Sequence, residues 1–158
     1  MRVGIIGLGL MGGSFALALR KYNLASKIYG CFRNHKQTQE VLDLNLVDEV
    51  LNLDELKEKS DLIVLAISVD KIIDYIPKLT NINSKTTIVD LGSTKKNILN
   101  NIPSIIRSNF IGAHPMVGTE KSGPSAAMNN FYENNVVVLC DTSMNSLYHL
   151  NKVKNIFS

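Results

Sequence analysis

Short apolar runs alternate with stretches of helical periodicity along the whole chain. The runs that favour β-strands span residues 3–6, 27–32, 61–67, 86–91, 110–113 and 135–140. Residues 61–67 (DLIVLAI) show no polar–apolar alternation, which indicates a strand covered on both faces. Strands separated by helices build a parallel sheet with helices on both sides. We therefore predict an α/β fold with a doubly wound, mainly parallel sheet of about six strands.

The stretches between these runs predict the helices that cover the sheet. The first follows the glycines near residue 12, and the others span residues 37–46, 54–59, 71–76, 96–102 and 147–157. For the helix over residues 71–76, Asp70 is the predicted N-cap, and Pro77 should disturb the helix end. Residues 47–53 favour either a short strand or a turn. No linker or internal repeat interrupts the pattern, so we expect one domain over residues 1–158.

Three glycines in the spacing G-x-G-x-x-G directly follow the first predicted strand. They are Gly7, Gly9 and Gly12, and a helical pattern begins at once. This strand–turn–helix context gives the dinucleotide-binding fingerprint its weight. Gly7 permits the tight turn, Gly9 lets the backbone approach a pyrophosphate, and Gly12 lets the helix pack on the strand. The helix N-terminus offers N–H groups to the phosphates. We therefore predict a Rossmann-type dinucleotide-binding domain.

Two other interpretations of residues 1–19 are weaker. A signal peptide would use Arg2 and the apolar run, but glycines interrupt that run and no A-x-A-like cleavage site follows. As a membrane span the stretch is too short.

The composition and charge indicate which kinds of binding partner are not expected for this chain. Of the 158 residues, 45% are hydrophobic and 20% are charged, which is typical of a soluble globular domain. The net charge is +3 and the basic residues are scattered, so nothing favours a nucleic-acid-binding face or a membrane surface. Cys31 and Cys140 lie in predicted strands and are expected to be buried thiols of a reducing cytoplasm, although a single disulfide between them is an alternative. We assign no metal ligands.

The end of the second predicted strand bears on cofactor choice. In NAD-selective folds an Asp or Glu about 20 residues beyond the glycines holds the ribose 2′-OH. Counting from Gly12 leads to Phe32, and residues 33–36 bring no carboxylate. Arg33 could instead hold a 2′-phosphate, or the segment is a solvated basic loop. The sequence therefore leans towards NADP over NAD.

Polar residues follow three of the predicted strands, where a parallel sheet presents its ligand crevice. Ser68 follows residues 61–67, and Ser93 follows residues 86–91, although Ser93 could equally cap the next helix. His114 stands after residues 110–113, ahead of ten loop residues rich in Gly, Pro and polar groups. Loops of that length are uncommon in compact sheets and tend to be functional. A lone histidine is more often structural, but this position makes His114 a catalytic candidate.

Three stretches together resemble the prephenate/arogenate dehydrogenase family of tyrosine biosynthesis. They are GLGLMGGS (residues 7–14), DLGSTK (90–95) and GAHPMVGTEKSG (112–123). Many β-hydroxyacid-type dehydrogenases share the first stretch, whereas the third is specific. The resemblance covers essentially the whole chain, but only the family's nucleotide-binding domain. It implies a second, all-helical domain, absent here, that forms a homodimer and supplies an arginine for the substrate carboxylate.

The resemblance also implies a reaction and its residues. Prephenate or arogenate would give a hydride to the nicotinamide, lose carbon dioxide and become aromatic. His114 would be the base that takes the ring hydroxyl proton, and Ser93 would orient that hydroxyl and the histidine. Thr119 would contact the substrate and Glu120 would join a gating ion network. The expected cofactor-binding residues are Gly7, Gly9, Leu10, Met11, Gly12, Arg33 and Ser68.

Two departures and two rival functions stay open. Many family members have an acidic residue where this chain has Phe32-Arg33, and proline is common at the position of Ser68. One rival is another hydride-transfer enzyme, of the 6-phosphogluconate or 3-hydroxyisobutyrate type, which would leave His114-Pro115-Met116 unexplained. The other rival is a non-catalytic nucleotide-binding module complete at Ser158, which has no evident use for Ser93 and His114.

Overall fold

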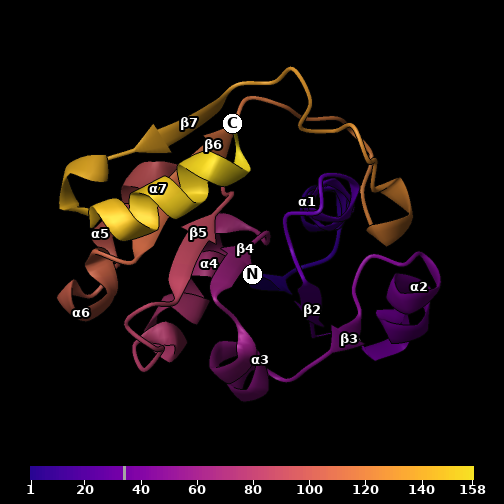
Figure 1. Cartoon of the computed structure of the whole chain (residues 1–158), viewed down its shortest axis with the longest axis horizontal. Coiled ribbons are helices and arrows are strands. Elements are labelled where there is room, and N and C mark those ends of the chain that lie inside the picture. Colours follow the sequence, from indigo (N-terminus) through magenta and orange to yellow (C-terminus); the bar gives the residue numbers. More distant parts are fainter. Residues whose placement is uncertain (34) are drawn as a thin grey trace.

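The computed structural model describes residues 1–33 and 35–158 (Figure 1). In this part of the chain seven strands form one sheet, in the order β3-β2-β1-β4-β5-β6-β7. Neighbouring strands are parallel except for β6 and β7. This confirms the predicted doubly wound, mainly parallel sheet. The strands are β1 (Arg2–Ile6), β2 (Lys27–Cys31), β3 (Glu49–Val50), β4 (Leu62–Leu65), β5 (Thr87–Asp90), β6 (Phe110–Pro115) and β7 (Val137–Cys140).

Helices cover both faces of this sheet. One core lies between the sheet and helices α1, α2 and α7, and includes Phe15, Val41 and Val153. The other lies beneath α3 to α6, and includes Leu56 and Ile98. The helices are α1 (Leu10–Lys21), α2 (Thr38–Asp43), α3 (Leu53–Lys59), α4 (Val69–Tyr75), α5 (Lys95–Asn100), α6 (Ser104–Arg107) and α7 (Leu147–Ile156), with 3-10 turns η1 (His35–Gln37), η2 (Ile76–Leu79), η3 (Pro124–Ala126) and η4 (Thr142–Met144).

The segment predicted as a strand or a turn contains the two-residue strand β3, so the strand alternative is correct, and the described residues form seven strands where about six were expected. Two other sequence-based assignments are wrong. Helix α4 begins at Val69 with Ser68 as its N-cap, so Asp70 lies in the first turn and is not the cap. Strand β6 extends through His114 and Pro115, because both residues pair with β7.

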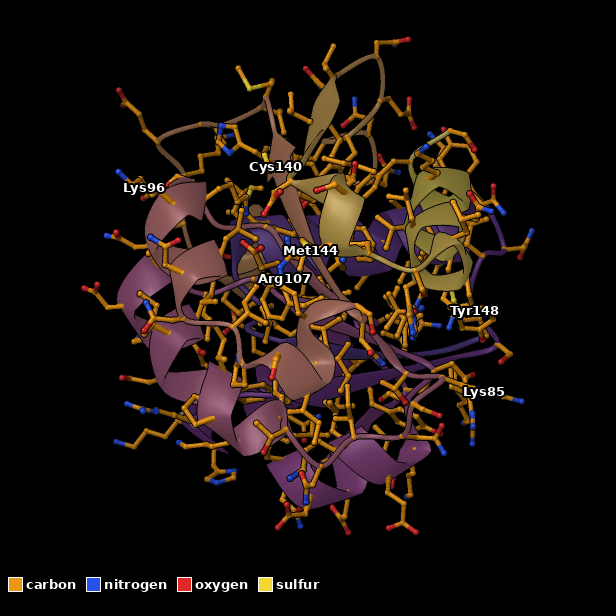
Figure 2. The ribbon with its side chains drawn as sticks, turned by 90° about the vertical axis from the view of Figure 1, so that its left-hand side faces the viewer. Lys85, Lys96, Arg107, Cys140, Met144 and Tyr148 are labelled. Atoms are coloured by element: carbon orange, nitrogen blue, oxygen red, sulfur yellow. The ribbon has the colours of Figure 1, made fainter. Side chains whose placement is uncertain are left out.

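The two cysteines are free thiols, so the alternative of a disulfide between them is wrong. Cys31 is buried as expected, whereas Cys140 is only partly buried. Strand β7 forms one edge of the sheet, which leaves Cys140 incompletely covered. Figure 2 views this side of the molecule, with Arg107 close to the turn η4 that carries Met144. Arg107 donates to the Asp141 carboxylate at 2.9 Å and so ties α6 to the end of β7.

Candidate dinucleotide-binding and catalytic site

The order of the strands creates a crevice at the carboxyl ends of β1 and β4. The chain leaves β1 towards β2 on one side, whereas β4 continues the sheet on the other side, and this reversal is where doubly wound sheets bind ligands. Gly7 turns the chain there with φ +92°, and a Cβ on it would lie 2.5 Å from the Ala66 carbonyl oxygen. A Cβ on Gly12 would lie 1.9 Å from the Gly7 carbonyl oxygen, so α1 packs closely on the turn.

The middle glycine of the fingerprint faces open space. A Cβ on Gly9 would meet no heavy atom of the described residues within 4 Å. Gly9 is also the N-cap of α1 and offers no side-chain cap, and the first turn of α1 carries no acidic residue. The N–H groups at this helix end are therefore available to an anion. This geometry fits the pyrophosphate of a dinucleotide.

A cavity of about 330 Å³ opens in front of these glycines. It is lined by residues 9–11 of α1, by residues 66–68 after β4, by Leu91 after β5 and by residues 121–123 of the long loop. The predicted cofactor residues Leu10, Met11 and Ser68 thus share one cavity. A larger cavity of about 570 Å³ lies elsewhere, between the second half of α1 and the end of α7, and it holds none of the predicted site residues.

Arg33 lies exposed just after β2. The N–H of Gly7 donates to the carbonyl oxygen of Cys31 at 3.0 Å, which joins the glycine turn to the end of β2. Arg33 follows two residues later and therefore lies at the rim of the crevice. Asn34, the next residue of the predicted basic segment, lies outside the described residues.

Ser93 follows strand β5 and His114 lies on the neighbouring strand β6, at the same edge of the sheet. Asp90, the last residue of β5, pairs with Gly112 of β6. Ser93 lies exposed in the turn after β5, and His114 is partly exposed inside β6. The structure therefore brings these two predicted catalytic residues to one region, although no hydrogen bond joins them among the residues described. Leu91 connects this region to the dinucleotide cavity.

The segment between β6 and β7 runs past the outer side of α1, as Figure 1 shows. Two hydrogen bonds hold it there: Met128 N–H donates to Ser14 Oγ at 2.9 Å, and the Tyr132 hydroxyl donates to the Met11 carbonyl at 2.8 Å. Thr119 and Glu120 lie exposed in this segment, directly before the three residues that line the cavity. The long loop thus borders the dinucleotide cavity, while the substrate roles of Thr119 and Glu120 stay predictions.

Comparison with known proteins identifies the family. Residues 15–158 match the model of the family described as "Prephenate dehydrogenase, nucleotide-binding domain". The chain belongs to this family. The resemblance found in the sequence motifs is thereby confirmed.

Individual relatives agree with this assignment. The prephenate dehydrogenase of Bacillus subtilis is 30% identical over 96% of this chain and 42% of its own length. That of Lactococcus lactis is 32% identical over 90% of this chain and 41% of its own length. A crystal structure of prephenate dehydrogenase from A. aeolicus, in complex with hydroxyphenyl propionate and NAD+, superposes with a TM-score of 0.92 at 32% identity. It covers 99% of this chain and 56% of that one. The chain thus spans about half the length of these relatives.

A buried ion pair beneath the site is absent from the sequence-based predictions. Asp90 is 0% exposed and pairs with Lys95, the first residue of α5. Asp90 Oδ1 also accepts a hydrogen bond from the Gly92 N–H at 3.0 Å. Burial raises the pKa of the Asp90 carboxyl and lowers the pKa of the Lys95 ammonium, and their mutual attraction opposes both changes. A charged residue at the end of an apolar strand, five residues before a lysine, is the sequence signal for this pair.

Two further findings concern the residues described. No group of three or more His, Cys, Asp or Glu side chains in residues 1–33 and 35–158 is arranged to hold a metal ion. In the same residues, every helix is too short or too polar to cross a bilayer.

Proposed function

We propose that this chain is the nucleotide-binding domain of a prephenate dehydrogenase and contributes His114 and Ser93 to its catalytic site. The observation that carries the proposal is the convergence of three strand ends. The glycine turn after β1 meets the cavity that Leu91 lines after β5, and His114 stands on the adjacent β6. Relatives that are named prephenate dehydrogenase, one of them solved with NAD+ and hydroxyphenyl propionate, support the same activity.

The residues present fit a nicotinamide dinucleotide. The open space at Gly9 and the free N-terminus of α1 would take the pyrophosphate. Met11 and residues 121–123 would flank the dinucleotide in the cavity. A bound NAD+ or NADP+ supplies the hydride acceptor of the reaction. In this arrangement the substrate lies at the ends of β5 and β6, within reach of Ser93 and His114.

The proposed chemistry is an oxidative decarboxylation. The ring carbon that bears the hydroxyl gives up a hydride, the ring carboxylate leaves as carbon dioxide, and the ring becomes aromatic. His114 would take the proton of the hydroxyl as general base, because histidine exchanges protons near neutral pH. Ser93 would orient the hydroxyl, Thr119 would contact the substrate and Glu120 would take part in gating.

The cofactor preference follows from the end of β2. Arg33 is exposed at the rim of the crevice, and residues 32–36 contain no carboxylate to hold a ribose 2′-OH. We therefore propose that NADP+ binds more tightly than NAD+, since Arg33 can donate two hydrogen bonds to a 2′-phosphate.

We also propose that the working enzyme contains a second, helical domain that clamps the substrate carboxylate and forms a homodimer. The relatives are about twice as long as this chain, which supports the idea. We place the enzyme in the cytoplasm, where unpaired thiols such as Cys31 and Cys140 persist.

Arogenate is the second candidate substrate. A crystal structure of Synechocystis arogenate dehydrogenase superposes with a TM-score of 0.89 at 27% identity, over 99% of this chain and 55% of that one. Arogenate carries an amine where prephenate carries a keto group, so the two differ at a position away from the ring hydroxyl that His114 would contact.

Steady-state kinetics of the full-length enzyme, with both substrates crossed with both cofactors, test the proposal. We expect turnover with prephenate on the order of 10 s⁻¹, the usual scale for enzymes. The 158-residue chain alone should bind the dinucleotide in calorimetry and turn over neither substrate, because in our proposal the helical domain supplies the clamp for the substrate carboxylate. A full-length enzyme that is inactive in all four combinations would contradict the proposed activity.

A further inference from the structure

The carboxylate of Asp90 and the ring of His114 lie on the same face of the sheet. Asp90, Gly112 and Cys140 form one row across β5, β6 and β7. Side chains alternate along a strand, so His114, two residues beyond Gly112, points to the same face as this row. That face is the one covered by α5, whose Ile98 packs with Ile88 and Phe110. In Figure 2, Cys140 lies close to α5, from which Lys96 points outward.

Gly112 makes room for the buried ion pair between these strands. A Cβ added at Gly112 would lie 3.5 Å from Cδ of Lys95 and 3.6 Å from Oδ2 of Asp90. The aliphatic part of Lys95 therefore runs past Gly112 to reach Asp90 Oδ1, while Asp90 Oδ2 faces β6. The carboxylate is held in this orientation by two donors on Oδ1, the Gly92 N–H and the Lys95 ammonium.

Two complementary polar atoms on this face have no partner. Within residues 1–33 and 35–158, Asp90 Oδ2 and His114 Nδ1 are both buried and neither makes a hydrogen bond. A buried polar atom without a partner is rare in native proteins and calls for a reason. One of these atoms is an acceptor, and the other is a donor when it carries the ring proton. His114 is also near enough to lower the pKa of the Asp90 carboxyl.

Resting on the proposed function, we infer that Asp90 is the positioning residue of His114. Asp90 Oδ2 accepts a hydrogen bond from His114 Nδ1–H when substrate and cofactor fill the site, while Lys95 and Gly92 hold Oδ1. Catalytic hydrogen bonds are commonly long in unliganded enzymes and tighten in the reactive complex. The proton on Nδ1 leaves Nε2 of His114 unprotonated, which is the state needed to take the proton of the substrate hydroxyl. A carboxylate that orients a histidine and fixes its tautomer is a recurrent arrangement in catalysis.

The tautomer of His114 tests the inference directly. The chain contains three histidines, so the ring nitrogens of a 15N-histidine-labelled sample can be assigned by NMR at about pH 8.5, where histidine is neutral. We expect His114 to carry its proton mainly on Nδ1, because the nearby carboxylate already favours that form in the free domain. His149 is the internal reference. Its Nε2 lies 3.1 Å from the Ser84 carbonyl and its Nδ1 lies 2.7 Å from the Thr87 hydroxyl, which favours the Nε2–H form.

The variant Asp90→Asn should reverse the tautomer of His114. The amide oxygen has to face the Gly92 N–H and Lys95, so the NH₂ group turns towards His114 and donates to Nδ1. His114 then carries its proton on Nε2, and His149 stays unchanged. In the full-length enzyme we expect kcat to fall by about 10²–10⁴ with KM little changed, the scale seen when a catalytic histidine is held in the wrong tautomer. Asp61→Asn is the matched control, because Asp61 pairs with Arg2 at the start of β1.

Two outcomes would overturn the inference: a wild-type His114 protonated on Nε2, or an Asp90→Asn variant that keeps the proton on Nδ1. The wild-type spectrum tests the inference by itself, even if the Asp90→Asn variant fails to fold. The expected tautomers in an enzyme that turns over neither prephenate nor arogenate would instead refute the proposed function alone.

Discussion

Two matched alanine substitutions, three residues apart, separate the packing role of the glycine turn from its predicted role in binding. A methyl group at Gly12 would lie 1.9 Å from the Gly7 carbonyl oxygen and 3.0 Å from the Ala66 Cβ. A methyl group at Gly9 would meet no heavy atom of the described residues within 4 Å, and the backbone there has φ −78°, which any residue adopts. The same chemical change is therefore expected to have two different effects.

Gly12→Ala should destabilise the fold. Overpacking of a close contact costs about 1–3 kcal/mol, and here the clash is with backbone that cannot rotate away, so the upper end of about 3 kcal/mol applies. Alanine recovers about 1 kcal/mol through its higher helix propensity. The net loss of about 2 kcal/mol should lower Tm by about 4–8 °C in a domain of this size.

Gly9→Ala should leave the stability of the fold nearly unchanged and lower the affinity for the cofactor. Replacing glycine by alanine at an N-cap costs less than about 1 kcal/mol, so Tm should fall by less than about 4 °C. The methyl group would occupy the space predicted for the pyrophosphate, and we expect the Kd for NAD+ or NADP+ to rise at least about tenfold, or about 1.4 kcal/mol.

Thermal unfolding and calorimetric titration of the two variants and the wild type give both quantities. Equal losses of Tm in the two variants would show that the packing argument for Gly12 is wrong. An unchanged dinucleotide affinity in Gly9→Ala would show that the pyrophosphate does not bind at the N-terminus of α1.

Three further predictions follow from the same structure. Arg33→Ala should remove most of an NADP+ preference of about 1.5–3 kcal/mol, measured by calorimetry, and equal affinities of the wild type for the two cofactors would refute it. His114→Asn in the full-length enzyme should cut kcat by about 10²–10⁴ at nearly unchanged cofactor affinity, and near-normal turnover would assign the base to another residue. Burial lowers the pKa of His149 below its usual value of 6.5. Its contribution to stability is therefore complete above about pH 6.5 and is lost as the pH falls through and below that value. Urea unfolding at pH 7.5 and 5.5 should show this loss, and His149→Gln should show less of it, whereas equal losses would assign the pH dependence to other groups.

The central strands were predictable because local sequence indicates their buried environment. Strands β4 and β5 are buried along their whole length, and the apolar runs at residues 61–67 and 86–91 predict them. The glycine turn was predictable for a similar reason, because its spacing and its strand–helix context are local. The family motifs then pointed to Ser93 and His114, which the structure places in the turn after β5 and on the adjacent strand β6.

The choices left open and the errors concern features that depend on distant partners. Strand or turn stayed open for residues 47–53, because β3 forms only through the pairing of Glu49 and Val50 with Tyr29 and Gly30 of β2. The start of α4 shows another limit. Ser68 caps it without a side-chain hydrogen bond, so the chemistry of the side chains gives no reason to prefer Ser68 over Asp70. An acidic residue in the first turn of a helix is favourable as well, so Asp70 fits its observed place equally well.

The position of His114 shows how a boundary error can matter for function. The sequence predicts a strand that stops at Ala113 and leaves His114 at the start of a loop. Pairing of His114 with Val138 and of Pro115 with Val137 extends β6 instead. A catalytic side chain on a paired strand is held more precisely than one on a loop. Pairing with β7 therefore holds His114 in place, and the sequence of residues 110–123 alone does not predict this pairing.

Asp90 marks the point where local sequence stops being informative. In isolation, an aspartate before Leu91-Gly92-Ser93 is typical of an exposed turn at the end of a strand. Its complete burial depends on Lys95 returning from α5 and on Gly112, on a different strand, leaving space for both side chains. A buried carboxylate is tolerated only when such partners are supplied, and removing one partner is strongly unfavourable. The ion pair, the glycine opposite it and the histidine beside it therefore form one unit that only the folded sheet assembles. In our proposal this unit sets the protonation state of the base.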